Sequence, residues 1–476
     1  MKHYILIAVL VAGVGCKKSV QVDAPETNPT RATLYTNDAS AAAVVTYIYA
    51  RMAGAGGTGF AQGNNSIGLL TGLSADELQT YTNVTGDFNN FYRNNNSINL
   101  NLTWRELYQY IFVANAVIEG IENSTGGMTD SVKKQLTGEA LFMRAFLHFY
   151  VVNLWGDAPY ITTTDYQVNK TAARTPKTEA FGKMVGDLQQ AQQLLPDNYV
   201  TPTGGPATER LRPNKWTATA FLARVYLYMG EWAKAESEAG TILSNTAKFA
   251  LVTDLTKVFL KDSKEAIWQV PQVLVSRATV EGDTYLLTPA TPIGNNNPAS
   301  LRTAFVNSFE TNDKRRTSWI DSPVISTVKY YCPSKYKIKQ LPTNVTPVPT
   351  SNEYFTIFRL AEQYLIRAEA RAQQSKVTEA QTDLNAVRTR ANLGPTDASD
   401  KSSLLTVIER ERQFELFTEW GHRWLDLKRT GRVDAVMSVV TPSKGGTWNT
   451  DMQLYPIPKN ELLLNPNLAP QNPGYN

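Results

Sequence analysis

The feature that most constrains the fold is a helix–turn–helix pattern whose buried positions are small. Ala220 and Ala223 lie on one helical face before a turn at Gly230, and Ala235 and Ala239 follow on the next helix. Glycine readily ends a helix because it adopts a left-handed backbone conformation, and alanines allow two paired helices to approach closely. The pattern therefore predicts packed helix pairs rather than a sheet.

A second unit of the same kind runs from Leu365 through a turn at Ser375 to Val387. Both units resemble tetratricopeptide repeats, which present a surface rather than an enclosed cleft. The helices expected over 104–122 and 131–154 should form a further pair. Apolar periodicity predicts helices over residues 40–52, 104–122, 131–154, 177–194, 214–229, 232–244, 360–374, 377–391 and 402–420. The helix over 177–194 should pack against that over 214–229.

Two long irregular stretches, about 54–103 and 276–356, interrupt the helical pattern. Loops of this length in a compact protein are usually functional or disordered. The glycine-rich run at 54–59 lacks the Lys-Ser/Thr of a phosphate-binding P-loop, so a plain loop is expected. The predicted fold is dominated by α-helices, with a loop-rich, irregular ligand-binding portion and minor β-structure. Its helical scaffold is expected at about 37–53, 104–244 and 357–430.

The first fifteen residues have the layout of a secretory signal peptide. Lys2 gives a basic start, residues 4–14 form an apolar core, and small residues precede Cys16. The apolar run is too short to remain as a membrane-spanning helix. Residues 16–36 are polar and contain Pro25 and Pro29, as is typical of a tether.

The residues before Cys16 resemble a bacterial lipobox, in which this cysteine becomes the acylated first residue of the mature protein. Gly13 departs from the pattern, because most lipoboxes have a bulky aliphatic residue there. The alternative is an ordinary secreted protein that is cleaved nearby. Several acyl chains on one cysteine would anchor the protein firmly, whereas a single chain binds a membrane only marginally.

Composition excludes several kinds of site. With Cys16 acylated, Cys332 is the only remaining cysteine, so neither an intramolecular disulfide nor a cysteine zinc site can form. Only three histidines are present, and His3 would leave with the signal peptide, so we expect no metal and no cofactor. A formal net charge of +4 over 476 residues is too weak to indicate nucleic-acid binding.

The segment Glu409–Arg432 combines dense charge with large aromatic side chains. Its apolar positions recur at the spacings of a helix with one buried face. Glu411 with Glu415, and Glu419 with Arg423, are expected at neighbouring positions on that helix. A charged pair is costly to bury unless it is fully hydrogen-bonded, so we expect a partly buried, structural ion-pair network rather than a catalytic centre.

This segment resembles the C-terminal hallmark of the SusD-like (RagB-like) nutrient-binding lipoproteins of Bacteroidetes. Blocks similar to those of the family follow one another over nearly the whole chain, with Trp155 and Ala158 as mild departures. In order, they are Gly138–Phe146, Leu154–Pro159, Arg174–Pro176, Ala220–Gly230, Arg359–Ala370, Leu454–Pro458 and Gln471–Tyr475.

The resemblance implies a signal peptide over 1–15, a lipidated tether over 16–36 and one SusD-like domain over 37–476. It also implies a lipid-anchored protein of the outer membrane that faces the cell exterior. Such proteins sit on a SusC-like TonB-dependent transporter, to which they deliver captured oligosaccharides or, in some branches, peptides. They are not enzymes.

Sugar recognition needs flat apolar faces for the rings and amide or carboxylate groups for the hydroxyls. Both kinds occur in the irregular stretches, where the resemblance implies the glycan site, although packing of the loops onto the scaffold would use the same residues. The candidate ligand-binding residues are Asp76, Tyr81, Phe88, Phe91, Tyr92 and Asn94 from the first stretch, with Tyr285, Trp319 and Tyr330 from the second.

Two other functions remain open from the sequence. A protein that captures oligopeptides should use backbone-pairing edges and fewer stacking faces. A glycoside hydrolase would require two carboxylates about 5–10 Å apart across a cleft. Asp76, Glu77 and Asp87 are available, but no catalytic string surrounds them. The sequence does not distinguish among possible glycans.

Overall fold

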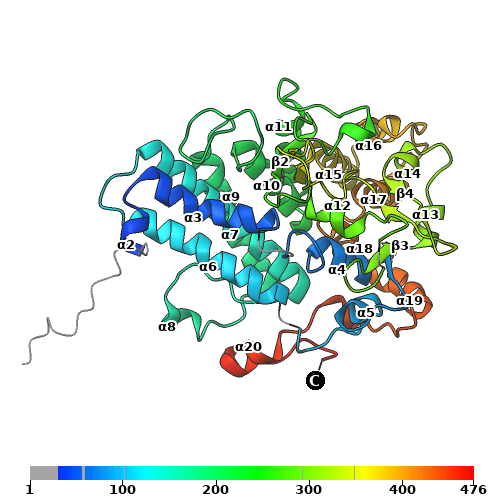
Figure 1. The fold of residues 1–476 in the computed structure, drawn as a ribbon, viewed down its shortest axis with the longest axis horizontal. Helices are drawn as coiled ribbons and strands as arrows, with labels where there is room; N and C mark the ends of the chain where they lie inside the picture. The colour runs from blue at the N-terminus through cyan, green and yellow to red at the C-terminus, as the bar shows by residue number, and fades with distance from the viewer. Residues whose placement is uncertain (1–30, 56–58, 101, 292, 348, 476) are drawn as a thin grey trace, which may run out of the picture.

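The computed structural model describes residues 31–55, 59–100, 102–291, 293–347 and 349–475. Helices dominate and the strands are few and short, which confirms the predicted fold class (Figure 1). The predicted signal peptide, Cys16 and part of the glycine-rich run (56–58) lie outside the described residues. Within the predicted tether, Arg31–Leu34 forms the short helix α2.

The α-helices are α2 (Arg31–Leu34), α3 (Asp38–Met52), α4 (Ile67–Ser74), α5 (Asp87–Tyr92), α6 (Leu102–Glu122), α7 (Asp130–Trp155), α8 (Tyr166–Asn169), α9 (Lys177–Leu194), α10 (Lys215–Met229), α11 (Trp232–Leu243), α12 (Val280–Tyr285), α13 (Thr303–Asn307), α14 (Lys314–Ser318), α15 (Leu360–Gln373), α16 (Val377–Arg390), α17 (Lys401–Leu416), α18 (His422–Arg429), α19 (Val433–Ser443) and α20 (Lys459–Leu464). The 3-10 helices are η2 (Leu255–Lys257), η3 (Thr450–Gln453) and η4 (Pro466–Leu468). The strands are β1 (Leu78–Thr80), β2 (Ala266–Val270), β3 (Ala299–Leu301), β4 (Ile320–Asp321), β5 (Val324–Ile325), β6 (Val328–Lys329), β7 (Cys332–Pro333) and β8 (Phe355–Arg359).

The long helices form the scaffold by packing in pairs, α6 with α7, α9 with α10, α10 with α11, and α15 with α16. These contacts confirm the predicted helix pairs. Helix α7 lies at the centre, where every residue from Gly138 to Trp155 is buried. A helix that is apolar nearly all round belongs inside a protein, and the polar residues of α7 are paired with neighbours. Gly138 permits close packing, because a Cβ there would lie 2.9 Å from Leu195 Cγ.

Local sequence signals account for where the scaffold helices begin and end. Asn214 and Thr217 form a capping box at the start of α10, and Gly230 ends this helix with a left-handed backbone (φ 75°). Asp400 and Ser403 form the same reciprocal cap on α17. Each cap satisfies backbone N–H groups that the first helical turn leaves without partners. The pairs therefore start and stop close to the predicted residues.

The prediction of one helix over 402–420 is wrong at its C-terminal end. Helix α17 stops at Leu416, and α18 begins only at His422. Between them, Thr418 (φ 58°), Trp420 (φ 50°) and Gly421 (φ 74°) adopt the left-handed region. The backbone thus turns where the apolar spacing alone suggested that the helix continues.

In Figure 1, α13, α14 and β4 of the loop-rich portion lie at the right, beside α16 and α17 of the scaffold. The loop-rich portion contains more structure than predicted. Helix α4, within the stretch expected to be irregular, is buried at every position. Antiparallel β2 and β8 pair from Ala266 with Arg359 to Val270 with Phe355. This pairing joins the two ends of the second irregular stretch beside the scaffold. Strands β1 and β3 join the two irregular stretches, with Leu78 opposite Leu301.

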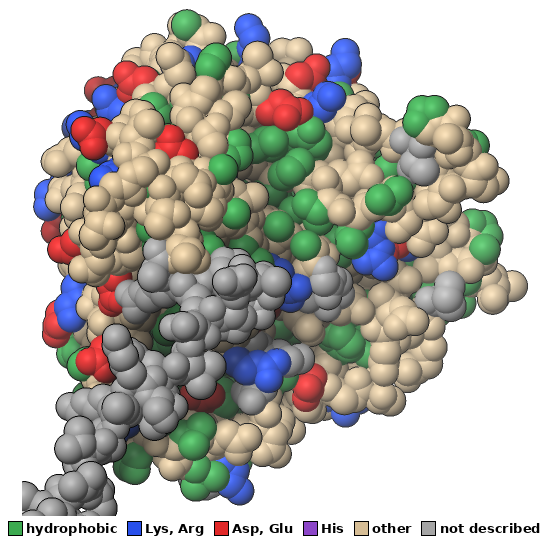
Figure 2. Space-filling model, turned by 60° about the vertical axis from the view of Figure 1, so that its left-hand side comes forward, with side chains coloured by type: hydrophobic (Ala, Val, Ile, Leu, Met, Phe, Trp, Pro, Cys, Tyr) green, Lys and Arg blue, Asp and Glu red, His purple; other side chains and the backbone are tan. Residues whose placement is uncertain are grey.

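Cys332 is buried and has no disulfide partner among the described residues. No helix among the described residues is both long and apolar enough to cross a membrane. Figure 2 shows basic and acidic side chains interspersed over the face drawn there, without a broad field of one sign.

Candidate functional site

Aromatic side chains from the two irregular stretches meet in one small cluster. The ring of Tyr81 lies edge-on to that of Tyr330, with 5.2 Å between centroids. Phe88 and Ile293 pack against the same apolar nucleus. We call Tyr81, Phe88, Ile293 and Tyr330 the aromatic cluster. The structure therefore brings together three of the predicted ligand-binding residues across more than 200 positions of sequence.

The cluster has a buried base and a partly exposed rim. Tyr81 is buried, and its hydroxyl donates a hydrogen bond to the carbonyl oxygen of Ala299 at 3.0 Å. Phe88 and Tyr330 each keep part of their ring exposed. The β5–β6 hairpin adds the exposed side chains of Val324 and Val328 nearby, because its Ile325 packs in the same nucleus. The rim thus offers apolar surface to a ligand.

A polar cleft of 980 Å³ opens on the loop-rich portion. Its volume is at the upper end of the range typical of small-molecule sites. Asp283 forms an ion pair with Arg277 (Oδ2 to Nε, 2.9 Å), and Lys339 Nζ donates to the Asp283 carbonyl oxygen at 2.6 Å. The side chains that line this polar cleft include Asn64, Arg277, Asp283, Thr284, Thr288, Thr291, Asn296, Asn297, Lys337, Lys339 and Gln340.

One turn, residues 293–297, connects the aromatic cluster with the polar cleft. Asn83 Nδ2 donates to the Ile293 carbonyl oxygen at 2.8 Å, and Asn64 Nδ2 donates to that of Asn295 at 3.0 Å. Ile293 packs in the cluster, whereas Asn296 lines the cleft. Rings and hydrogen-bonding groups therefore flank a single ridge, which is the arrangement that sugar recognition requires.

Three predicted ring contacts are buried instead, so the prediction that they offer open stacking faces is wrong. Trp319 is 0% exposed, Phe91 1% and Tyr285 2%. Trp319 Nε1 donates to the carbonyl oxygen of Leu255 at 2.9 Å. Phe91 packs edge-on against Tyr455, with centroids 5.2 Å apart. These rings stabilise the loops against the scaffold.

Two further predicted residues hold the loops by polar contacts. Asp76 binds Arg423 in a two-pronged ion pair, with distances of 2.8 Å from both Nε and Nη2. Burial opposes ionisation of this carboxyl, but the adjacent Arg423 outweighs it and lowers the pKa of Asp76. Buried Asn94 takes a left-handed backbone (φ 55°) and donates from Nδ2 to the Ser74 carbonyl oxygen at 2.9 Å. Asn94 is buried, and the Asp76 carboxylate is occupied by its ion pair with Arg423.

Tyr92 has a different environment from the other predicted residues. Its ring is partly exposed, and Lys444 Nζ lies 5.3 Å from its centroid. Burial raises the pKa of the Tyr92 hydroxyl. It packs against the main core rather than in the aromatic cluster.

The expected ion-pair network of the hallmark segment is present and deeply buried. Glu415, 0% exposed, contacts three guanidinium groups, those of Arg315, Arg359 and Arg390. Burial opposes ionisation, but these positive charges outweigh it and hold the pKa of Glu415 well below its usual range. The network confirms a structural role for this segment.

Particular pairs in that segment differ from the predicted ones. Glu419 pairs with Lys335 and Arg359 rather than with Arg423. The reason is the break after Leu416, which removes the helical spacing between positions 419 and 423. Glu411 binds Arg315 at 2.6 Å and is buried instead of lying on the surface.

Two carboxyl groups between the loops and this network have no guanidinium partner among the described residues. The pKa of Glu281 is raised to about 8, mainly because the carboxyl group is buried. Burial, and then the nearby negative charge of Asp76, raises the pKa of Glu77 to about 8. Each accepts a backbone hydrogen bond, Glu281 from Gly63 at 3.4 Å and Glu77 from Thr418 at 3.3 Å. Both carboxyl groups are therefore mostly protonated at pH 7.

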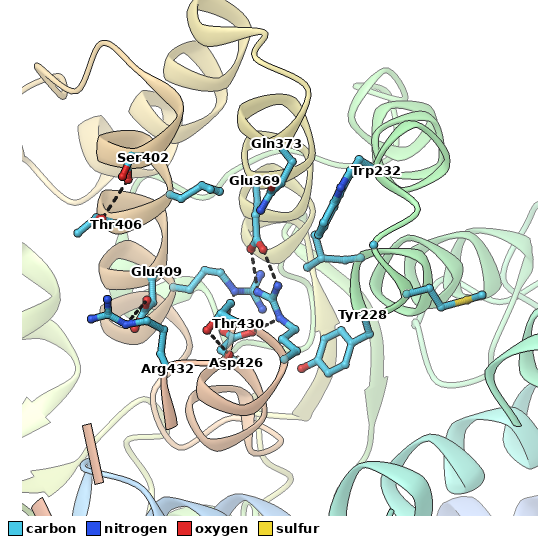
Figure 3. Close-up of a pocket in the computed structure, with 16 residues that line it drawn as sticks. Tyr228, Trp232, Glu369, Gln373, Ser402, Thr406, Glu409, Asp426, Thr430 and Arg432 are labelled. Carbon is cyan, nitrogen blue, oxygen red and sulfur yellow. Dashed lines mark hydrogen bonds and ion pairs between the residues drawn. The ribbon is translucent and has the colours of Figure 1, made fainter. Parts of the chain in front are cut away.

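A second hollow, of 540 Å³, lies between the end of α10 and helices α15, α17 and α18 (Figure 3). On its floor, Arg429 binds Glu369 (Nη2 to Oε2, 2.7 Å) and Asp426 (Nε to Oδ1, 2.8 Å). Arg412 Nε also binds Asp426, whereas its two Nη atoms and the Tyr228 hydroxyl have no hydrogen-bond partner among the described residues. Two guanidinium groups thus meet two carboxylates, so the charges cancel, and ordered water can satisfy the remaining groups. We assign these residues to the scaffold.

The polar cleft was not anticipated from the sequence. Its threonines, asparagines and lysines come from irregular segments without periodicity, and only the length of those segments indicated a functional role. Asn64 and Asn83 lie in the first irregular stretch, and the sequence gives no signal that singles out either of them. Among the described residues, no group of three or more His, Cys, Asp or Glu side chains could hold a metal ion.

Two family models match this chain, one in its N-terminal half and the other in its C-terminal half. Residues 55–227 match a family described as "Starch-binding associating with outer membrane", and residues 285–475 match the SusD family. The chain is 28% identical over 436 residues to SusD-like protein P2 of Formosa agariphila, covering 82% of this chain and 83% of that protein.

Solved structures share the fold over almost the whole chain. A SusD superfamily protein of Bacteroides vulgatus superposes with a TM-score of 0.78 at 19% identity, covering 93% of this chain and 100% of the other. Surface glycan-binding protein A of Bacteroides thetaiotaomicron, in complex with laminarihexaose, gives a TM-score of 0.74 at 19% identity, with 92% and 100% covered. Since the N-terminal and C-terminal parts both match and relatives align along most of the length, the chain belongs to the SusD family.

Proposed function

We propose that this protein captures an oligosaccharide at the aromatic cluster and the polar cleft and delivers it to a SusC-like TonB-dependent transporter. In this proposal it is a lipoprotein anchored in the outer membrane through Cys16 and facing the cell exterior. It acts by binding rather than by catalysis and needs no cofactor. Membership of the family supports glycan binding. The choice of site rests on the aromatic rings and the polar groups that lie next to one another in the structure.

The physical argument concerns the two sides of the ridge at residues 293–297. Phe88 and Tyr330 present ring surface to the C–H faces of a sugar, and covering about 80–100 Å² of such a face gains roughly 2 kcal/mol at ~25 cal/mol per Å². Amide, hydroxyl and charged groups of the polar cleft can donate to and accept from sugar hydroxyls. A peptide binder would rely on an open strand edge instead.

The choice of test glycans follows from the similar proteins. One neighbour is a laminarin-binding SusD-like protein, and another was solved with laminarihexaose. Both are only about one-fifth identical to this chain, so they guide the choice of ligands without fixing it. Laminarin and starch oligosaccharides are therefore the first glycans to test, beside xylan, mannan and a set of oligopeptides.

Replacing Phe88 and Tyr330 together by Ala is expected to weaken glycan binding by about thirtyfold, because the one sugar face that the two rings would cover between them is worth roughly 2 kcal/mol. Isothermal titration calorimetry on protein that starts after Cys16 measures the dissociation constant. The double variant should keep the thermal midpoint of the wild type within a few degrees, since both rings are partly exposed.

The control for this experiment is Tyr47→Ala, which removes a 44% exposed ring from α3 on the scaffold. It should bind glycan like the wild type. Equal binding by the double variant would reject the aromatic cluster as the site. Binding of peptides alone would move the protein to peptide capture, and sugar release that is lost in Asp87→Asn would indicate a hydrolase.

Cys16→Ala is expected to release the protein from the membrane fraction, because the cysteine is the proposed site of acylation. Metabolic labelling with palmitate and fractionation of cells measure the two consequences, and the variant should lose the label. A Lys17→Ala control should keep both the label and the membrane association. A labelled Cys16→Ala protein would contradict the proposed anchor.

A further inference from the structure

Basic side chains outnumber acidic ones in the polar cleft. Among its lining residues, Arg277, Lys337 and Lys339 are basic, whereas Asp283 is the only one with a carboxylate. The whole chain, by contrast, has a formal net charge of only +4 over 476 residues. The positive charge is therefore a local property of the cleft. A cleft lined mainly by one sign of charge attracts ligands of the opposite sign.

The single carboxylate of the cleft is shared between two of these cations. Asp283 Oδ2 lies 2.9 Å from Arg277 Nε, and Oδ1 lies 3.8 Å from Lys339 Nζ. Gln340 Nε2 donates to the same Oδ1 at 3.3 Å. One negative charge cannot balance both cations, so a positive charge remains without a carboxylate to neutralise it.

The ammonium group of Lys339 bonds to neutral acceptors instead. Its Nζ donates to the carbonyl oxygens of Asp283 at 2.6 Å and Leu286 at 2.8 Å. An ammonium group has three donors, and 3.8 Å to Asp283 Oδ1 is too long for a hydrogen bond. Burial lowers the pKa of Lys339 and outweighs the attraction of Asp283, which raises it. A ligand with negative charge would accept the third donor and offset that cost.

Arg277 and Lys337 also offer donors to a ligand. The contact of Arg277 with Asp283 uses Nε, and the side chain is 32% exposed, so its Nη groups are accessible. A guanidinium group binds an oxyanion well, because two parallel N–H groups match two oxygen atoms. Lys337 Nζ donates to the Ser318 carbonyl oxygen and to Ser334 Oγ, both of which are neutral.

We infer that the captured oligosaccharide is anionic, and that its carboxylate or sulfate group binds between Arg277 and Lys339 in the polar cleft. This inference rests on the proposed function, because it names the class of glycan for the same site. Uronates and sulfate esters share the chemistry that the cleft can recognise, a negative charge on oxygen atoms beside a sugar ring. Hydrogen bonds to a charged acceptor are roughly twice as strong as those between neutral groups, so the cleft discriminates by charge.

The test compares neutral and anionic oligosaccharides on protein that starts after Cys16. The neutral set contains laminarin, starch, xylan and mannan oligosaccharides, and the anionic set contains those of polymannuronate, polygalacturonate and κ-carrageenan. Isothermal titration calorimetry measures each dissociation constant. The tightest anionic ligand is then measured again after its charge is removed, by reduction of the carboxyl groups or by desulfation. This step also distinguishes a uronate from a sulfate ester.

The tightest ligand of the panel is expected to be anionic, and removal of its charge should weaken binding by about tenfold or more. If the tightest ligand is neutral, or if the uncharged form binds equally well, the inference is wrong. The proposed function then still stands, provided that the neutral glycan is lost in the Phe88 and Tyr330 double variant. If no glycan of the panel binds, the proposed function fails and this inference fails with it.

Substitutions in the cleft separate charge from structure. Arg277→Gln should weaken binding of the anionic glycan by about tenfold and leave binding of its uncharged form within about twofold. Arg277→Lys, which keeps the charge, should restore part of the loss. Asp283→Asn removes the competing carboxylate and should tighten binding of the anionic glycan, a gain that mere damage to the fold would not produce.

The control is Lys234→Gln, which removes a charge from a 60% exposed side chain on α11 of the scaffold. It should bind both forms of the glycan like the wild type. The thermal midpoints of all variants show whether each remains folded. Equal losses for the charged and uncharged forms in Arg277→Gln, or weaker binding of the anionic glycan by Asp283→Asn at an unchanged midpoint, would overturn the inference.

Discussion

Glu415→Gln is expected to lower the free energy of unfolding by about 3–5 kcal/mol, the cost of breaking a buried ion-pair network. The carboxylate is fully buried and contacts Arg315, Arg359 and Arg390. Glutamine retains the shape but removes the negative charge, which leaves the three guanidinium groups with less compensation. The nearby aromatic ring of Trp319 cannot replace that charge, although Arg359 and Arg390 both lie within 6 Å of it.

Urea unfolding, followed by tryptophan fluorescence and by circular dichroism, measures this loss. The matched control is Glu179→Gln, which breaks the exposed ion pair between Glu179 and Lys183 on α9. Exposed pairs of this kind contribute little, so the control should change stability by less than about 1 kcal/mol. A Glu415→Gln protein as stable as the control would show that the network does not hold the loops on the scaffold.

The second large effect is a dependence of stability on pH that originates in Glu281. Its pKa is about 8 in the folded protein, because of burial, against 4.5 for an ordinary glutamate. Between pH 4.5 and pH 8, Glu281 is protonated in the folded protein but has lost its proton in the unfolded protein. Stability contributed by this group therefore falls as pH rises, by up to about 1.4 kcal/mol per pH unit.

Glu281→Gln is expected to remove this dependence and to be more stable than the wild type by several kcal/mol at pH 8, and by little at pH 4.5. Glutamine mimics the protonated carboxyl and can still accept the hydrogen bond from Gly63. Urea unfolding of both proteins at pH 4.5, 6, 7 and 8 measures the difference. The comparison stays at or below pH 8 because burial lowers the pKa of Lys335 to about 8, which adds an opposite slope above it.

Taking the difference between the two proteins isolates Glu281 from other titrating groups. Burial lowers the pKa of His148 and His422, so their contributions rise with pH, but they do so equally in both proteins. Glu77→Gln should behave like Glu281→Gln, since its pKa is also about 8. Glu379→Gln, a change on exposed surface of α16, is the control and should leave the pH profile unchanged.

The helical scaffold was predictable because its signals are local. Apolar periodicity gave the bounds of α9 without error, and Gly230 marked the end of α10. Helix α4 was missed because it is buried on all sides and contains two glycines, so no periodic apolar stripe identified it. The break after Leu416 was missed because tertiary contacts set it, among them the pairing of Glu419 with Arg359 and Lys335.

The candidate site was predictable in residue type but not in exposure. Phe88 and Trp319 look alike as aromatics within irregular sequence, yet one lies on a rim and the other is fully buried. The difference arises because Lys335, Arg359 and Arg390 converge on the Trp319 ring from distant parts of the chain. Such convergence cannot be deduced from local composition. For the polar cleft, the sequence composition does not distinguish the lining residues from other loop residues.

The pairing of β2 with β8 has a consequence for how this family can diversify. These two strands hold the ends of residues 271–354 together, so the segment between them is a closed loop, which β3 and Arg315 also attach to the rest of the fold. Lengthening a closed loop is inexpensive, since each doubling costs only about 0.6 kcal/mol of chain entropy. The exposed turns of this loop, among them residues 293–297, can therefore change in length during evolution while the helices keep their packing. A graft of the whole loop onto another scaffold would also have to preserve the ion pair between Arg315 and Glu415.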